Sequence, residues 1–173
     1  MSETATKNDV ITIDMFNRIT KQETLHPLVT VADLSRDSLS EDLRLPCDFY
    51  ALVCKKDCAG KNDVIKLVNP GDTFEVPAAN HCATRAYTGI LFHPDLLCDT
   101  PLEHHIGNYP MRCSCRSVLT GRDKDIIAEC IHEIDRELHH AIDRHSALII
   151  VSHIELLLNY CTRFCDKRES TNY

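Results

Sequence analysis

The stretch IDRHSALIIVSHIELLLNYCTRF, from Ile142 to Phe164, decides the fold. It predicts a helix from 145 to 164, with Asp143 placed to cap its first turn. One helical neighbour would need an apolar arc of about 100°. The apolar residues here cover most of the circumference, namely Leu148, Ile149, Ile150, Val151, Ile154, Leu156, Leu157, Leu158, Tyr160, Cys161 and Phe164. The sequence therefore predicts two buried contacts for this helix.

The second contact of this helix is expected to be a partner subunit. The span looks too short for a membrane helix and is interrupted by polar residues, Ser152, His153, Glu155 and Asn159. Closed two-fold dimers are the commonest soluble oligomers. We therefore predict a homodimer whose interface is formed by Ile150, Ile154, Leu157 and Cys161. The alternative is that the rest of the same chain covers this arc.

A second helix is predicted to begin after Thr120, where the apolar spacing changes to three and four residues. The repeating positions are Ile126, Ile127, Cys130, Ile131, Ile134 and Leu138, and charged residues occupy the other face. Thr120 and Asp123 have the spacing of an approximate capping box. Residues 119–165 are thus expected to form an antiparallel helical pair for dimerisation.

Residues 21–118 are expected to form a β domain. Its short apolar stretches are rich in β-branched or aromatic residues and bounded by Pro, Gly, Asn or Asp. They are LVTVADL from Leu28, CDFYALVC from Cys47, DVIKLV from Asp63, TFEVP from Thr73 and YTGILF from Tyr87. Because strands and helices do not alternate, the strands are expected to pair antiparallel in a sandwich or barrel. Residues 1–20 would be an arm on this domain and 166–173 a linker or tail.

Composition and charge limit the function classes. Hydrophobic residues make up 43% and charged residues 26%, which is typical of a globular protein. The net charge of −7 disfavours direct binding of duplex DNA. No secretory signal or membrane span is evident, so a cytoplasmic, soluble protein is expected, with its ten cysteines reduced.

Four segments resemble the sensor region of AraC-type transcriptional regulators: LHPLVTVADLS from Leu25, CDFYALVCKK, ILFHPDLLCDTPL and, most specifically, the stretch from Ile142 to Phe164. The resemblance covers residues 24–165. It implies an α+β fold with a cupin-like antiparallel β-barrel (jelly roll), followed by a C-terminal two-helix dimerisation element. The barrel would sense an unidentified small-molecule effector. DNA would be read only by a helix-turn-helix part, for which too few residues follow Cys165.

The segment NPGDTFEVPAANH, from Asn69 to His81, resembles the second conserved segment of cupins. In it, Gly71 would supply an unusual turn dihedral and Pro77 would end a strand. Cupin metalloenzymes combine a histidine near His81 with a His-x-His pair and a glutamate. Because no His-x-His precedes His81, we expect no metal, no cofactor and no enzymatic activity. The alternative is a small cupin metalloenzyme of the isomerase or dioxygenase type.

Four polar side chains in or beside apolar strands are candidate ligand-binding groups: Tyr50, His81, Tyr87 and His93. His93 lies between an apolar strand and a proline turn, where it could either satisfy loop backbone or face a cavity. A filled barrel would instead indicate a purely structural dimerisation module. The sequence does not identify the effector.

Overall fold

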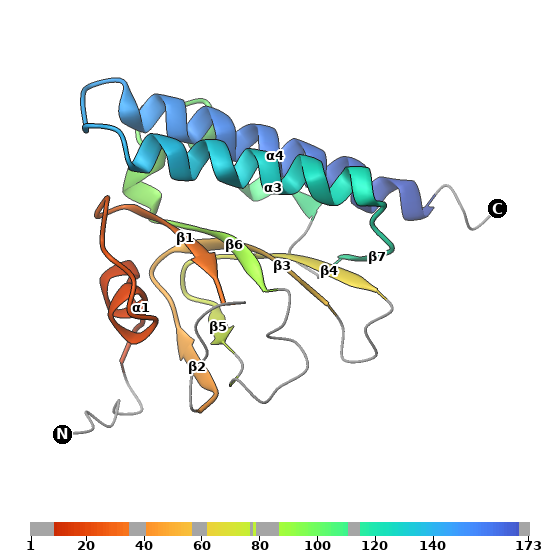
Figure 1. The fold of residues 1–173 in the computed structure, drawn as a ribbon, viewed down its shortest axis with the longest axis horizontal. Coiled ribbons are helices and arrows are strands. Elements are labelled where there is room, and N and C mark those ends of the chain that lie inside the picture. The colour runs from red at the N-terminus through yellow and green to blue at the C-terminus, as the bar shows by residue number, and fades with distance from the viewer. Residues whose placement is uncertain are drawn as a thin grey trace.

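The computed structural model describes residues 9–34, 41–56, 62–76, 78, 87–110 and 115–169. The chain is α+β, with antiparallel sheets and a C-terminal helix pair, as Figure 1 shows. The strands are β1 (Val29–Asp33), β2 (Leu43–Pro46), β3 (Tyr50–Lys56), β4 (Asp63–Val68), β5 (Thr73–Val76), β6 (Thr88–Phe92) and β7 (Cys115–Ser117). The helices are α1 (Ile13–Ile19), α2 (Leu102–His105), α3 (Gly121–Leu138) and α4 (Ser146–Glu169), with short 3₁₀ helices at Pro94–Leu97 and Ile106–Asn108.

The strands form two sheets within the described residues. One has the order β1-β6-β3-β4-β7, and the other pairs β2 with β5. Every ladder is antiparallel, which confirms that prediction. All five predicted strands are present, and Gly71 has the expected positive φ of 90° in the turn before β5. A closed barrel is not seen among these residues, because the second sheet is separate from the first.

The two long helices run antiparallel across one face of the larger sheet (Figure 1). The predicted capping box is confirmed at the start of α3. Thr120 Oγ1 accepts the Asp123 N–H at 3.1 Å, and the Asp123 carboxylate accepts the Thr120 N–H at 3.1 Å. Asp143 accepts the N–H of His145 at 2.8 Å in the turn before α4. These local bonds fix where each helix begins.

Two apolar cores lie on opposite faces of the larger sheet. On the face toward α3 and α4, side chains such as Leu52, Ile65 and Ile90 pack against both helices. On the other face, Phe49, Phe74 and Leu91 form a second cluster with the N-terminal segment. Alternate residues of each central strand face opposite sides, so one strand sequence supplies both cores.

The N-terminal arm packs onto the second core as a helix. Ile11, Ile13 and Phe16 are buried there, and the Phe16 ring meets the edge of the Phe74 ring at a centroid distance of 5.9 Å. Thr12 caps this helix by accepting the Met15 N–H. A strand or arm was expected over residues 1–20. The described part of this segment contains a short helix, α1, which packs on the β domain as an arm would.

The predicted dimer interface is wrong in its residues. Ile150, Ile154, Leu157 and Cys161 are each at most 1% exposed in the single chain. They belong to the core between the helix pair and the sheet. The rest of the chain therefore covers the arc that was assigned to a partner, because α4 lies beside α3 over the same sheet face and contacts β7 and the 3₁₀ helix at Pro94–Leu97 (Figure 1).

The exposed apolar side chains of α4 are different ones. Leu148 is 55% exposed, Ile149 is 39% exposed and Leu156 is 45% exposed. We call these three residues the α4 apolar strip. By length and composition, α4 is also the one helix of the described residues that could cross a membrane. Its length and its polar residues had predicted that it could not. Its Ile154, Leu157 and Phe164 are nevertheless packed in the core, as in a core helix of a globular domain.

The cysteines are not all reduced, because Cys165 is disulfide-bonded in the structure. The free thiols are those of Cys47, Cys54, Cys98, Cys130 and Cys161. Cys58, Cys82 and Cys113 lie outside the described residues. The expectation of ten free thiols is therefore wrong at Cys165.

Candidate functional site

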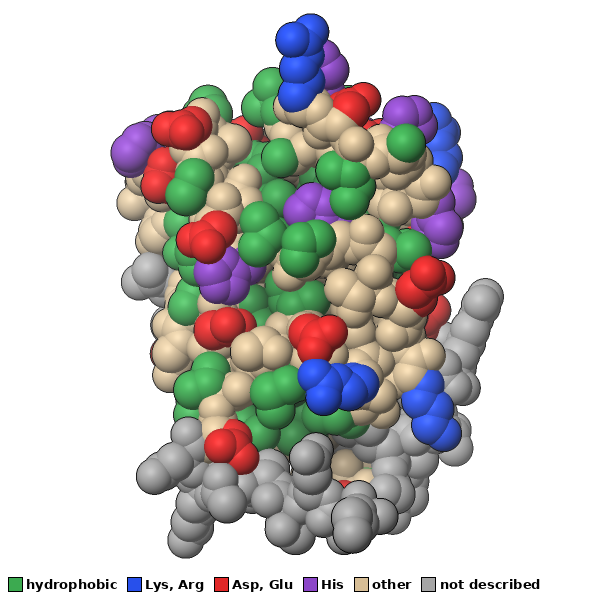
Figure 2. All heavy atoms as spheres, turned by 90° about the vertical axis from the view of Figure 1, so that its left-hand side faces the viewer, with side chains coloured by type: hydrophobic (Ala, Val, Ile, Leu, Met, Phe, Trp, Pro, Cys, Tyr) green, Lys and Arg blue, Asp and Glu red, His purple; other side chains and the backbone are tan. Residues whose placement is uncertain are grey.

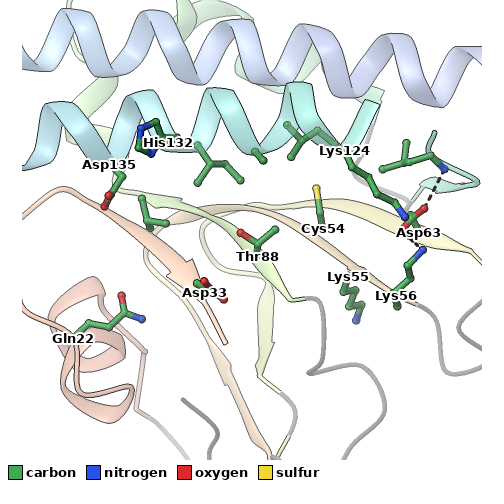
Figure 3. A pocket seen from close by; sticks show the side chains of 15 residues that line it. Gln22, Asp33, Cys54, Lys55, Lys56, Asp63, Thr88, Lys124, His132 and Asp135 are labelled. Carbon is green, nitrogen blue, oxygen red and sulfur yellow. Dashed lines mark hydrogen bonds and ion pairs between the residues drawn. The ribbon is translucent and has the colours of Figure 1, made fainter. Parts of the chain in front are cut away.

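A cleft of about 700 Å³ lies between α3 and the larger sheet. Figure 3 shows α3 on one side of it, β1, β6 and β3 on the other, and labelled side chains from both. Its volume is in the range of small-molecule sites. The cleft is the candidate functional site of this chain.

Strand register supplies one wall of the cleft. Thr88 on β6 is paired with Asp33 on β1 and with Cys54 on β3. The three side chains therefore form a row across the sheet, on the face toward α3. Val31, two residues before Asp33, lines the cleft from the same face.

The α3 wall has helical spacing. Ile127 and Ile131 lie at its base and are 4% and 8% exposed. Lys124, Ala128 and His132 follow one another at intervals of four residues beside them, and all three are exposed. The cleft thus has an apolar floor with a polar rim along the helix.

One end of the cleft is basic. Lys56 and Lys124 line it together with Asp63, whereas the side chain of Lys55 points away from α3, as Figure 3 shows. Asp63 Oδ1 lies 2.7 Å from Lys56 Nζ, and Asp63 Oδ2 accepts the Leu119 N–H at 3.0 Å. This buried carboxylate thereby joins β3 and β4 to the segment that leads into α3. Its negative charge is neutralised within the fold by the ion pair with Lys56.

The other end is acidic. Gln22, Asp33, His132 and Asp135 lie there in Figure 3. Asp135 Oδ1 is 3.7 Å from His139 Nδ1, and 45% of the Asp135 side chain is exposed. The cleft therefore has opposite charges at its two ends and apolar side chains between them.

Cys54 places a thiol inside the cleft. Its hydrogen bond with Cys161, together with burial, raises the pKa of the Cys161 thiol well above its usual value. Burial also raises the pKa of the Cys130 thiol. Thiols that remain protonated at neutral pH are weak nucleophiles. Cys130 and Cys161 therefore act as small core residues.

The predicted ligand-binding residues do not come together in the cleft. Tyr50 lies on β3, and its ring stacks on Phe92 with a centroid distance of 5.4 Å. Tyr87 is buried in the second core, and its hydroxyl has no hydrogen-bond partner among the described residues. Burial raises the Tyr87 pKa above its usual value. His81 lies outside the described residues.

His93 satisfies loop backbone, which is the first of its two predicted roles. Its Nδ1 accepts the Asp95 N–H at 3.1 Å and caps the 3₁₀ helix at Pro94–Leu97. It does not line the cleft. Among the described residues, no group of three or more His, Cys, Asp or Glu side chains could hold a metal ion.

Sequence reasoning missed the cleft because its residues carry no local signal. Lys124, His132 and Asp135 are polar residues of an amphipathic helix, and their helical spacing is the same whether they face water or line a cleft. Only the crossing of α3 over β1 and β6 turns this face into a cleft wall.

Comparison with protein-family models found none that matches this chain, and comparison with curated proteins found no significant match.

Proposed function

We propose that this chain is the effector-sensing and dimerising domain of an AraC-type transcriptional regulator, and that it is not an enzyme. The observation that carries the proposal is the cleft, which lies directly under a helix of the C-terminal pair. A ligand in it would contact the sheet and α3 at once. The resemblance of residues 24–165 to the sensor regions of such regulators supports the same function.

The cupin-like form of the fold is part of this proposal. Two antiparallel sheets that share an aromatic cluster of Phe16, Phe49 and Phe74 support this form. The Phe49 and Phe74 rings meet edge to face at 5.2 Å. This interior is filled by side chains, so the sheet face toward α3 is the better place for an effector.

The mechanism is a shift of populations between two arrangements of α3. Ile127 and Ile131 contact the cleft, while Ile134 and Leu138 of the same helix pack in the core with α4. A ligand that fits one position of α3 better than another thus also biases α4. The effector has to bind the two arrangements with different affinity for this to work.

Dimerisation is proposed to use the α4 apolar strip. Its residues Leu148 and Leu156 are eight positions apart and lie on one side of the helix, with the small Ser152 between them. The turn before α4 adds Ile142, which is 61% exposed. Figure 2 shows that hydrophobic side chains lie at the surface of this end of the molecule, among acidic and histidine side chains. A second copy would cover the strip in a two-fold contact.

The test of effector binding uses a variant that fills the cleft. Ala128 is exposed on α3, so Ala128→Trp should fold and obstruct the site, and Glu129→Trp on a neighbouring exposed position is the control. A metabolite at a hundred times its Kd should stabilise the wild type by about 2.7 kcal/mol in thermal unfolding. We expect the same stabilisation in Glu129→Trp and none in Ala128→Trp. A compound that stabilises all three proteins equally would place the effector elsewhere.

The test of dimerisation is sedimentation velocity at tens of micromolar protein. We expect a dimer for the wild type and a monomer for Leu156→Glu. A monomeric wild type at these concentrations would rule out the dimerising role.

A further inference from the structure

We propose that Cys54 and Cys161 form an oxidation site, in which a hydroperoxide that enters the cleft converts the two thiols to a disulfide. The disulfide would join β3 of the larger sheet to α4. This modification goes beyond effector sensing and does not depend on it. The contact between the two thiols and their unequal access to the cleft carry the proposal.

The two thiols meet although they come from distant parts of the chain. Cys54 lies on β3 and Cys161 on α4, and both belong to the core between the helix pair and the larger sheet. Both thiols are free in the structure. A hydrogen bond joins the two side chains. It places the sulfurs close enough that rotation of the side chains can bring them to the disulfide bond length of about 2.0 Å.

Cys54 is the thiol that an oxidant reaches first. It lines the cleft, and Figure 3 shows its side chain pointing from β3 toward α3. Only 9% of Cys54 is exposed, so the oxidant has to be small. A hydroperoxide meets this requirement, and its first product with an accessible cysteine is a sulfenic acid.

Cys161 is suited to react second. It is 0% exposed, so an oxidant in the cleft meets Cys54 before it. The hydrogen bond with Cys54, followed by burial, raises the pKa of the Cys161 thiol well above its usual value. Cys161 therefore keeps its proton in the reduced pair and packs as a core residue. Because thiolates rather than thiols attack hydroperoxides, the first step falls to Cys54.

The reaction balances in two steps. The Cys54 thiolate attacks one peroxide oxygen and the O–O bond breaks. The second oxygen leaves with the proton of the Cys54 thiol, as an alcohol or, from hydrogen peroxide, as water. The Cys161 sulfur then attacks the sulfenic sulfur, the S–O bond breaks, and the hydroxide takes the Cys161 proton and leaves as water. The two thiols lose two electrons and the peroxide gains two.

Contact between the sulfurs compensates for the weak nucleophile in the second step. Groups that are held together in a folded protein react as if they were at very high concentration. The sulfenic acid of Cys54 forms beside the Cys161 sulfur, and both lie in a packed core. The disulfide is therefore expected to form within one chain.

A third thiol of the same core supplies the control. Cys130 of α3 is buried and does not line the cleft. It lies near Cys161, because its charge adds to the rise in the Cys161 pKa, after the larger effects of Cys54 and burial. The hydrogen bond nevertheless joins Cys161 to Cys54. Removing Cys130 should therefore leave the disulfide intact.

The experiment treats the purified, reduced chain with hydrogen peroxide, blocks the remaining thiols with N-ethylmaleimide and maps tryptic peptides without reduction. Trypsin releases Cys54 in peptide 45–55 and Cys161 in peptide 145–163. Fragmentation of the linked peptides then distinguishes Cys54 from Cys47, which lies in the same peptide. We expect the link between Cys54 and Cys161 in monomeric wild type and in Cys130→Ala, and its loss in Cys54→Ala and Cys161→Ala.

The route of the oxidant is tested with the two tryptophan variants of α3. Ala128→Trp obstructs the cleft and should slow formation of the link severalfold, whereas Glu129→Trp should match the wild type. Thermal unfolding checks that each variant is folded. The wild-type map decides the main question even where a variant does not fold.

Three results would overturn the proposal. One is a Cys54 thiol that stays reduced while the exposed Cys98 is oxidised. Another is a Cys54 that is oxidised to sulfinic acid without any link to Cys161. The third is a disulfide that joins Cys161 to Cys130, or one that joins Cys54 to Cys161 only between two chains.

Discussion

Replacing Leu157 by Glu should unfold the domain, whereas the same change at the preceding residue, Leu156, should not. Leu157 is 1% exposed in the core between the helices and the sheet, and Leu156 is 45% exposed. Removing a buried leucine side chain costs about 2–5 kcal/mol. Keeping the new carboxyl neutral at pH 7, against a usual pKa of about 4.3, costs roughly 4 kcal/mol more.

The sum of about 6–9 kcal/mol is comparable to the total stability of a domain, which is about 5–15 kcal/mol. Leu156→Glu should change the stability by only about 0.5 kcal/mol, as surface substitutions do. Urea unfolding, followed by circular dichroism, measures the stability of both variants. Sedimentation velocity then measures the oligomeric state of each variant that stays folded. A folded, monomeric Leu157→Glu variant with the wild-type midpoint would refute the core position of Leu157. It would instead support the dimer interface that the sequence predicts for this residue.

Three further outcomes are expected. Thr120→Ala removes the hydroxyl that accepts a backbone N–H in the first turn of α3 and should lower the free energy of unfolding by about 1 kcal/mol in urea titrations; an unchanged midpoint would contradict the cap. Gly89→Ala should destabilise by about 3 kcal/mol, because the new Cβ would press on the Leu52 carbonyl oxygen; a neutral effect would mean that β3 and β6 can separate there. Burial lowers the pKa of His26 below 6.5, so the unfolded chain binds more protons and stability should fall as the pH drops from about 6.5 toward the folded-state pKa. His26 Nδ1 accepts the Leu28 N–H, and His26→Asn keeps an acceptor without the titration, so a pH profile equal to that of the wild type would refute this assignment.

Much of the fold could be predicted from local patterns. The strand at Asp63–Val68 and its neighbours have β-branched residues between turn residues, and they form where expected. The Thr120 and Asp123 pair marks the start of α3 because a capping box involves only residues three apart. Gly71 similarly takes the positive φ that its turn requires.

The residues of the candidate site could not be predicted from such local patterns. Asp33, Thr88 and Cys54 become neighbours through strand register, although at least twenty residues separate each from the next in the chain. Tyr50, Tyr87 and His93 were chosen for their polarity beside apolar strands, but a side chain's local sequence does not show which face of a sheet it occupies. Tyr87 is in the second core and His93 caps a 3₁₀ helix.

The sequence by itself determined the antiparallel strands, the helix pair and the excess of apolar surface on α4. Periodicity and capping are properties of neighbouring residues, and they hold whatever the rest of the chain does. Only the tertiary structure decided what covers that surface. A broad apolar arc is satisfied equally by a partner or by the rest of the chain, and here the chain's own core buries Ile154 and Leu157 and leaves Leu156 exposed. The cleft arises for the same reason, since it exists only where α3 passes over β1 and β6.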